Sequence, residues 1–429
     1  MPRAELESRW RAKIKGLRIR QGIWRFSRYI RASDPSQGWK IHVSATVLSA
    51  ANTYARVSRI LRQHRALFKV PADLALLSHL NSGAAGYSQI GKFITVYTRS
   101  SDEALILISK LHAATRGLSG PQIPFDVRYR TNSTVHYRYG AYTSGPNGKR
   151  GYILDPKGRP HIDKCAPRHA IPSWVTDLQI EPRITSRRKG SIGLEYLVRR
   201  AFTQRGKGGV FEVLDLSVFP SRIVVLKQGR RHGDTDWNAD DGASRVKREA
   251  RILRRLHAAG IPVPEVLRTF RQEGNQYLVL EKLAGRPLLS QPSQRPSRPS
   301  WRRAQRILDV LGHLLSKMHS TGWVWRDCKP AHIFRHRGAI RLIDFEGACL
   351  IDETDVLPWG SPNYVPPIYH GKFSRRPGTM EDDYALGVIA FQFLSGKFPA
   401  NSSRRRASIY KETRCPDPLR SSIENLLRV

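Results

Sequence analysis

The residue types best suited to chemistry lie in the C-terminal half of this 429-residue chain. Asp327 and Lys329 stand two positions apart, and Asp344 follows 17 residues after Asp327. Phosphoryl transfer from ATP requires a carboxylate that orients the attacking hydroxyl, a cation that neutralises the transferred group, and a carboxylate that holds Mg²⁺. The placement of these three residues predicts a phosphotransferase site.

Earlier elements of the chain complete this series. Gly206 and Gly208 belong to a glycine-rich turn that would let the backbone approach phosphate closely, although Phe211 takes the place of a third glycine. A strand ends at Lys227, which suits the α- and β-phosphates, and Glu249 on the next helix can pair with that lysine. The ordered set resembles a protein kinase, which implies ATP or another nucleoside triphosphate together with Mg²⁺.

One position departs from the kinase pattern. Kinases usually place Asn where this sequence has His332, and Mg²⁺ prefers oxygen ligands to imidazole. We expect Asp344 and His332 to form the metal site, and a pseudokinase with impaired catalysis stays open as an alternative. The segment 344–367 is short and offers few hydroxyls, so we expect activity without prior phosphorylation of this segment.

A second constellation lies near the N-terminus. Its segments are residues 38–45, 68–70, 80–83, 91–97 and 135–140. These segments resemble the N-terminal lyase domain of class III and class IV lanthipeptide synthetases, a family that is itself similar to bacterial phosphothreonine lyase effectors. The resemblance implies that the kinase phosphorylates Ser or Thr of a ribosomal precursor peptide with a leader, and that the lyase eliminates the phosphate to give dehydroalanine or dehydrobutyrine.

The side chains of these segments suit phosphate elimination, which needs a base, an acid and fixed cations, but no metal. Lys40 and His42 are two apart on one expected strand and therefore face the same side. We assign Lys69 as the base and His42 as the acid, whereas Lys40 and Lys92 would grip the phosphate. Tyr97 lies five residues from Lys92 and should face away on a regular strand. Further candidates for phosphate contacts are Arg128, Arg130 and Arg138.

As a base, Lys69 needs a pKa well below the value of about 10.4 that lysine has in free peptides. Like-charge repulsion from Lys40, Lys92 and nearby arginines would supply this depression, and a bound phosphate dianion would partly offset it.

The elements that must position these residues alternate between strands and helices. We expect strands at 39–43, around Lys69, at 91–97 and at 134–139, with a helix that Ser44 or Thr46 caps and another at 101–114. The fold class is therefore α+β, with a phosphothreonine-lyase-like domain followed by a bilobal protein-kinase-like domain. The expected divisions are a basic extension at 1–34, the lyase-like domain at 35–182, and the kinase-like domain at 183–429 with a Pro/Ser/Arg insert at 290–300.

Composition narrows the partners only to anionic ones. The chain has 73 Lys and Arg against 35 Asp and Glu, a net charge of +38 that would attract nucleic acid, an anionic membrane, an acidic peptide or phosphorylated substrates alike. Four widely spaced cysteines without a metal-ligand spacing fit a reducing cytoplasm. We expect a cytoplasmic protein, because no apolar run reaches the length of a membrane span and the start of the chain is unlike a signal peptide.

We favour a bifunctional kinase and lyase that dehydrates a ribosomal peptide. Because the expected kinase C-lobe extends to Val429, we expect ring formation by a separate cyclase or tailoring enzyme. Two alternatives are a Ser/Thr kinase whose N-terminal domain only recognises phosphoproteins, and a pseudokinase that binds nucleic acid. Recognition alone needs no acid or base, so Lys40, His42 and Lys69 favour the first reading, with nucleic acid an unlikely partner.

Overall fold

The computed structural model describes residues 2–143, 151–166, 170–178, 190–290, 294–354, 356–370 and 376–428. The chain divides into two compact units. The first consists of Met1–Arg222, Leu226–Arg245 and Phe270–Tyr277, and the second of Ile223–Val225, Val246–Thr269 and Leu278–Val429. The expected domain boundary at residue 182 and part of the expected insert at 290–300 lie outside the described residues.

A seven-stranded antiparallel sheet with the order β1-β2-β4-β5-β3-β7-β6 organises the N-terminal part of the chain. Its strands are β1 (Ile19–Gln21), β2 (Trp24–Phe26), β3 (Gln37–Val43), β4 (Leu67–Pro71), β5 (Ile94–Tyr97), β6 (Val127–Arg128) and β7 (Val135–Ala141). The helices are α1 (Arg3–Ile14), α2 (Ala50–Gln63), α3 (Leu74–Ser82) and α4 (Ser101–Ala114), with a 3-10 turn η1 (Tyr87–Gln89) and a small hairpin of β8 (Tyr152–Leu154) and β9 (Pro160–Ile162).

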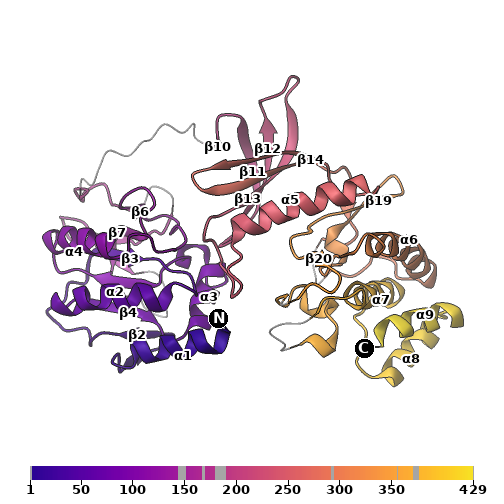
Figure 1. Ribbon diagram of the computed structural model, residues 1–429, viewed down its shortest axis with the longest axis horizontal. Coiled ribbons are helices and arrows are strands. Elements are labelled where there is room, and N and C mark those ends of the chain that lie inside the picture. The colour runs from indigo at the N-terminus through magenta and orange to yellow at the C-terminus, as the bar shows by residue number, and fades with distance from the viewer. Residues whose placement is uncertain are drawn as a thin grey trace. The chain divides into compact units, whose positions relative to one another are not determined.

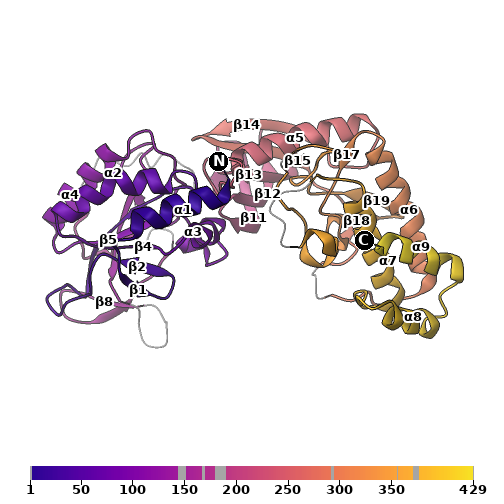
Figure 2. The ribbon, with the colours of Figure 1, turned by 60° about the horizontal axis from the view of Figure 1, so that its bottom comes forward.

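Alternation along the strands separates the apolar core from the polar face of this sheet. Trp39, Ile41 and Val43 of β3 are buried in one cluster with apolar side chains from α1, α2, α3 and α4. Figure 2 shows α2 and α4 on one side of β4 and β5. Burial of each large apolar side chain contributes about 1.5–3 kcal/mol. A slip of β3 by one residue would place Lys40 and His42 in this core, so the hydrophobic pattern fixes the register.

Residues 1–34 contribute to the same core rather than standing apart from it. The indole of Trp10 on α1 is fully buried, with ring centroids 5.6 Å from Tyr54 and 5.2 Å from Phe93. Strands β1 and β2 extend the sheet beyond β4, with Phe26 paired to Lys69. The segment that the charge pattern marks as an extension is therefore part of the folded sheet.

The predicted N-cap of α2, the helix that follows strand β3, is wrong. Helix α2 begins at Ala50 with Ser49 as the residue before it, so neither Ser44 nor Thr46 is its N-cap. The Thr46 hydroxyl instead accepts a hydrogen bond from the backbone N–H of Ser49 at 3.1 Å. The chain makes a turn after β3 before the helix starts, and this turn delays the helix by several residues.

A six-stranded sheet with the order β10-β11-β12-β13-β15-β14 follows along the chain. Its strands are β10 (Ser191–Ile192), β11 (Tyr196–Arg205), β12 (Gly208–Asp215), β13 (Arg222–Gly229), β14 (Val266–Gln272) and β15 (Asn275–Glu281), and helix α5 (Gly242–Ala258) lies between β13 and β14 in the sequence.

The second unit is mainly helical beyond residue 300, as Figure 1 shows. Its helices are α6 (Trp301–His319), α7 (Met380–Ser395), α8 (Ser403–Glu412) and α9 (Asp417–Leu427), with 3-10 turns η3 (Pro330–His332), η4 (Pro362–Tyr364) and η5 (Pro367–Tyr369). Two small sheets are formed by β16 (Arg286–Pro287), β18 (Ile333–His336) and β19 (Ala339–Leu342), and by β17 (Trp323–Val324) and β20 (Cys349–Leu350).

Helix α7 explains the richest apolar run of the sequence. Residues 385–394 of this helix are all buried, in clusters that also contain side chains of α6 and α9. A helix that is apolar on all sides is typical of a protein core. Within the described part of the chain, no helix combines the length and the apolar character that a membrane span needs.

Candidate functional site

An open cavity of about 260 Å³ lies on the polar face of the seven-stranded sheet. The structure brings five of the predicted residues together in its lining: Lys40, His42, Lys69, Lys92 and Arg138. The strand register explains why they meet. Thr95 of β5 pairs with His42 of β3 on one side and with Lys69 of β4 on the other. Lys40 pairs in turn with Arg138 of β7, so the sheet presents these groups in adjacent rows.

Tyr97 lines this cavity together with Lys92, so the expectation that the two face away from each other is wrong. The argument assumed one regular strand from Gly91, whereas β5 begins only at Ile94. Lys92 lies in the preceding turn, where its N–H donates to the carbonyl oxygen of Gln89 at 3.2 Å. Alternation of faces does not apply across a turn, so both side chains reach the same space.

The surroundings of Lys69 favour the neutral form of its amine. Lys69 is half-buried, and its Nζ lies 4.3 Å from the ring centroid of Trp24, which belongs to β2 and also lines the cavity. Burial, followed by the neighbouring charges of Lys40 and Lys92, lowers the pKa of Lys69 to about 7. Near neutral pH, Lys69 is therefore a neutral amine in a substantial fraction of the molecules, as proton abstraction requires.

The phosphate-binding candidates Lys40 and Arg138 share one carboxylate. Arg138 is buried and forms an ion pair with Asp163, and Lys40 Nζ lies 3.7 Å from Oδ2 of the same aspartate. Burial lowers the pKa of Lys40 to about 8, although Asp163 acts to raise it. The cavity keeps more cations than carboxylates along its wall, which suits a dianionic ligand.

His42 is held by an acid that sequence reasoning missed. Its Nδ1 lies 2.5 Å from Oδ2 of Asp126, and both side chains are buried. Burial lowers the pKa of His42 to about 4 against the opposing effect of Asp126, so the ring is neutral near pH 7. Because a carboxylate accepts, Nδ1 of the neutral ring carries the proton and Nε2 does not. His42 can therefore act as an acid only after it gains a proton, which an approaching phosphate dianion favours.

Two predicted phosphate contacts lie elsewhere. Among the described residues that line the cavity, neither Arg128 nor Arg130 occurs. Arg128 Nε donates to Nε2 of the buried His136 at 3.4 Å, and the exposed Arg130 guanidinium lies 5.2 Å from the ring centroid of Tyr129. A phosphate role for these two arginines stays a prediction.

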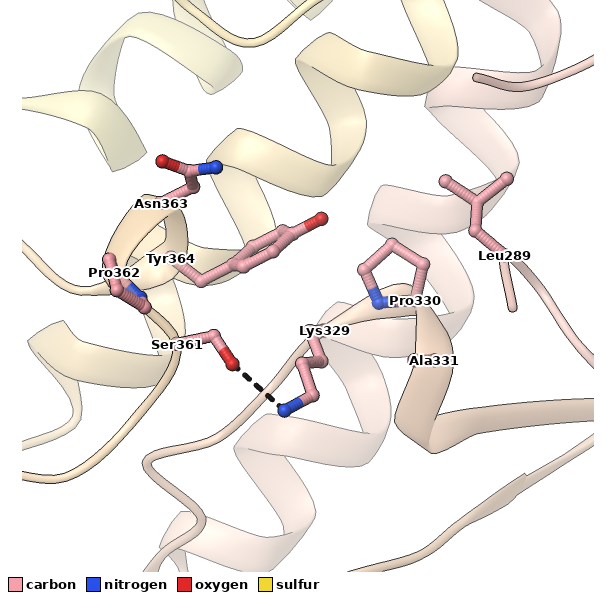
Figure 3. A pocket seen from close by; sticks show the side chains of 8 residues that line it. All are labelled: Leu289, Lys329, Pro330, Ala331, Ser361, Pro362, Asn363 and Tyr364. Carbon is pink, nitrogen blue, oxygen red and sulfur yellow. Dashed lines mark hydrogen bonds between the residues drawn. The ribbon is translucent and has the colours of Figure 1, made fainter. Parts of the chain in front are cut away.

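The phosphotransferase residues of the second unit are also close together. Lys329 Nζ donates to Oδ2 of Asp327 at 2.8 Å and to Oγ of Ser361 at 2.8 Å, the latter drawn in Figure 3. Ser361 Oγ in turn donates to Oδ1 of Asp327 at 3.0 Å. An apolar hollow of about 160 Å³ lies beside them and includes Leu289, Pro330 and Tyr364 in its lining (Figure 3). The carboxylate of Asp327 is thus fixed by two donors on the edge of an open site.

The backbone around Asp327 is fixed by a second missed acid. Oδ2 and Oδ1 of Asp382, which is fully buried, accept from the N–H groups of Trp325 and Arg326 at 2.8 and 2.7 Å. Helix α7 turns Asp382 toward the segment that carries Asp327, whereas the next residue, Asp383, is only partly buried.

Asp344 follows strand β19 in a strained conformation. Its φ of 65° lies in the left-handed region, which is uncommon outside glycine and recurs at functional sites. The next residue, Phe345, donates its N–H to Oε1 of the buried Glu249 at 3.1 Å. Glu249 therefore supports the segment that carries Asp344, and its pairing with Lys227 stays a prediction. Asp344, His332 and Asp327 offer ligand atoms within 4.8 Å of one another, so they could hold a metal ion.

The glycine-rich turn has a structural reason for its glycines. A methyl group added to Gly206 would lie 1.7 Å from the carbonyl oxygen of Asn81, and one added to Gly208 would lie 1.7 Å from that of Gln228. The N–H of Gly206 also donates to the carbonyl oxygen of Ser82 at 3.0 Å. Packing against protein backbone thus requires glycine at both positions, and their contact with nucleotide stays a prediction.

Four residues of these sites escaped sequence reasoning: Trp24, Asp126, Ser361 and Asp382. Each reaches its partner across a long stretch of sequence, from 34 residues between Ser361 and Asp327 to 84 between Asp126 and His42. Ser361 had the clearest local signal, since it is one of the few hydroxyls in the segment 344–367 that follows Asp344. The others carry no local spacing that distinguishes them from ordinary core or surface residues.

Comparisons with known proteins match two successive parts of the chain to two families. Residues 4–190 match the family described as the N-terminal domain of RamC, and residues 203–425 match the protein kinase domain family. A Streptomyces coelicolor protein named probable SapB synthase is 30% identical over 391 residues, which cover 87% of this chain and 41% of that protein.

The kinase relatives match a shorter part of the chain. Serine/threonine-protein kinase PknA of Mycobacterium tuberculosis is 28% identical over 231 residues, 52% of this chain and 52% of that kinase. Serine/threonine-protein kinase pkn2 of Myxococcus xanthus is 31% identical over 216 residues, 47% of this chain and 24% of that kinase. The chain spans about half or less of the length of these curated relatives.

The matches confirm the predicted resemblance to lanthipeptide synthetases and the predicted α+β architecture with a kinase domain in the C-terminal part. The chain belongs to the protein kinase domain family, and its N-terminal part is a domain of the RamC type.

Proposed function

We propose that this chain dehydrates Ser and Thr residues of a ribosomal precursor peptide in two steps, phosphorylation followed by elimination of the phosphate. The observation that carries the proposal is the convergence of Lys40, His42, Lys69 and Arg138 on one cavity, in a chain that also carries a kinase domain. The relationship to probable SapB synthase supports a peptide substrate.

In the first step, Asp327 orients the Ser or Thr hydroxyl of the peptide and accepts its proton. Lys329, held 2.8 Å from Asp327, neutralises charge on the phosphoryl group as it moves. Asp344 and His332 would hold the divalent cation, which when bound neutralises the phosphate oxygens of ATP. The apolar hollow beside Ser361 would receive a neighbouring side chain of the peptide.

In the second step, the neutral amine of Lys69 removes the Cα proton of the phosphorylated residue. The electrons of the C–H bond form the Cα=Cβ double bond while the Cβ–O bond breaks, and the phosphate leaves. Lys40, Lys92 and Arg138 hold the departing dianion, and protonated His42 gives it a proton. Asp126 keeps the imidazole oriented and stabilises its protonated form.

A second candidate function is supported by the neutral state of His42. A cavity rich in cations whose histidine lacks a proton on Nε2 would also suit recognition of a phosphorylated residue without its elimination. The chain would then be a Ser/Thr kinase with a phosphopeptide-binding domain.

Mass spectrometry separates the two functions. The full chain is incubated with a synthetic phosphothreonine peptide, without ATP, and elimination removes the elements of phosphoric acid from the peptide. We expect elimination by the wild type, its loss in Lys69→Ala, and wild-type behaviour in Lys13→Ala, a matched variant at an exposed lysine of α1. Binding of this peptide without any elimination would refute the lyase step and support the second candidate.

The kinase step is tested with Asp327→Asn. This variant should lose phosphorylation of a Ser/Thr-rich precursor peptide by about 10²- to 10⁴-fold, because it lacks the group that accepts the hydroxyl proton. It should still eliminate the phosphate from the synthetic phosphothreonine peptide, because the two steps use different residues. Full dehydration from ATP by this variant would contradict the assignment.

A further inference from the structure

The candidate metal group of the kinase domain contains an imidazole whose position suits direct coordination. His332 Nε2 lies 3.4 Å from Oδ2 of Asp344. Two ligands that are each about 2.1 Å from one cation are separated by about 3.0 Å at a right angle and about 3.4 Å at a tetrahedral angle. The observed separation therefore lets one ion contact both atoms.

The other ring nitrogen determines which tautomer is present. Nδ1 of His332 lies 3.1 Å from the carbonyl oxygen of Asp327 and 3.5 Å from its Oδ2. Both oxygens only accept hydrogen bonds, so Nδ1 carries the proton of the neutral ring and Nε2 is the unprotonated nitrogen. Histidines that ligate metals usually donate their second N–H to a carbonyl or carboxylate in this way.

The backbone fixes the ring beside Asp344. His332 ends the 3-10 turn η3, where its N–H donates to the carbonyl oxygen of Lys329 at 2.9 Å. Its own carbonyl oxygen accepts from the N–H of Ile343 at 3.0 Å, the residue directly before Asp344. The imidazole and the carboxylate are therefore held together by main-chain hydrogen bonds, which favours a preformed site.

The donor set decides which ions are favoured. Mg²⁺ demands oxygen ligands and gives up water reluctantly, whereas first-row transition dications accept imidazole, with affinity that rises from Mn²⁺ toward Cu²⁺. We propose that His332 Nε2 and the Asp344 carboxylate bind a divalent transition metal in preference to Mg²⁺. The inference deepens the proposed kinase function and rests on it for its biological role, but the binding itself can be measured without catalysis.

Pulsed electron paramagnetic resonance of the full chain with Mn²⁺, alone and with ADP, tests the coordination. A directly bound imidazole gives nitrogen modulation in the spectrum of Mn²⁺. We expect this modulation in the wild type, its loss in His332→Asn, and its persistence in His336→Asn, a matched change at an exposed histidine four residues away on β18. A wild type without nitrogen modulation, or modulation that persists in His332→Asn, would overturn the proposal.

Competition between Mn²⁺ and Mg²⁺ tests the preference. We expect His332→Asn to weaken Mn²⁺ binding by about tenfold or more while Mg²⁺ binding stays equal or improves, because Asn restores an oxygen ligand. Equal weakening of both ions would refute the selectivity. Peptide phosphorylation is measured separately. Nitrogen modulation without phosphorylation under either ion would support the metal site and refute the kinase function. Phosphorylation with Mg²⁺ in the absence of nitrogen modulation would support the kinase function and refute the metal site.

Discussion

The protonation of Lys69 provides a sharp test of the proposed lyase chemistry. A lysine with the ordinary pKa of 10.5 is only about 0.03% neutral at pH 7, whereas a lysine with a pKa of about 7 is about half neutral. The cavity therefore raises the fraction of Lys69 in the neutral form about a thousandfold. Since the neutral amine is the active form, kcat/KM for elimination from a phosphothreonine peptide should rise with pH and level off above an apparent pKa near 7.

The profile of kcat should differ from that of kcat/KM. The kcat profile reports groups in the complex with bound substrate, where the phosphate dianion stabilises the ammonium form of Lys69. We therefore expect its rising limb at a higher pH. Lys40→Met removes one of the charges that depress this pKa, so the limb of kcat/KM should move toward alkaline pH by about one unit. The control Lys13→Met should leave it in place.

The assay is quantification of the dehydrated peptide by liquid chromatography and mass spectrometry at constant ionic strength from pH 5 to pH 10. Loss of phosphate affinity in Lys40→Met changes the height of the profile, so the position of the limb is the quantity to compare. A wild-type limb near the ordinary lysine value, or a limb in Lys40→Met that moves toward acid, would show that Lys69 is not the base or that its neighbours do not control it.

Three further experiments test the packing at Gly206, the role of Trp24, and the need for phosphorylation of the enzyme itself. Gly206→Ala should lower the melting temperature, because overpacking would reduce the free energy of unfolding by about 1–3 kcal/mol. Gly16→Ala should leave the melting temperature unchanged, because no atom lies within 4 Å of the added methyl group. Equal melting temperatures of the two variants would contradict the close approach at Gly206. Trp24→Leu should slow elimination about two- to fivefold by loosening the position of Lys69, and Trp24→Phe should retain the rate, so equal loss in both would exclude a role for the ring. Phosphatase treatment of the enzyme should leave its phosphorylation of the peptide unchanged, because Arg326 already binds the carboxylate of Glu381 and two carbonyl oxygens and needs no phosphate as a partner. Activity that is lost on treatment and regained only after rephosphorylation would refute this.

Local sequence was a good guide where chemistry and structure share a short segment. Strand β3 followed from its alternation of apolar and polar residues, and helix α4 was predicted with the bounds that the structure has, Ser101–Ala114. The pair Asp327 and Lys329 could be recognised because one loop carries both residues. In these cases the interactions that set the conformation lie within a few residues of each other.

Local reasoning failed where a turn interrupted a regular element and where two interacting groups lie far apart in the sequence. Tyr97 was placed on the wrong side because the sequence does not reveal that β5 starts after Lys92. Asp382 was missed because its backbone partners, Trp325 and Arg326, lie more than 50 residues away, and only the packing of α7 brings them together.

The sequence by itself determined the kinds of chemical groups and the elements that carry them. The tertiary structure alone decided that Asp126 orients His42, that Trp24 covers Lys69, and which cations share one cavity. The physical reason is that these partners lie on different strands, and the register between strands is set by burial of the opposite, apolar face. The spacing of residues along the chain does not reveal that register. The sequence therefore indicated which residues could form the site, and only the fold showed which of them lie close together.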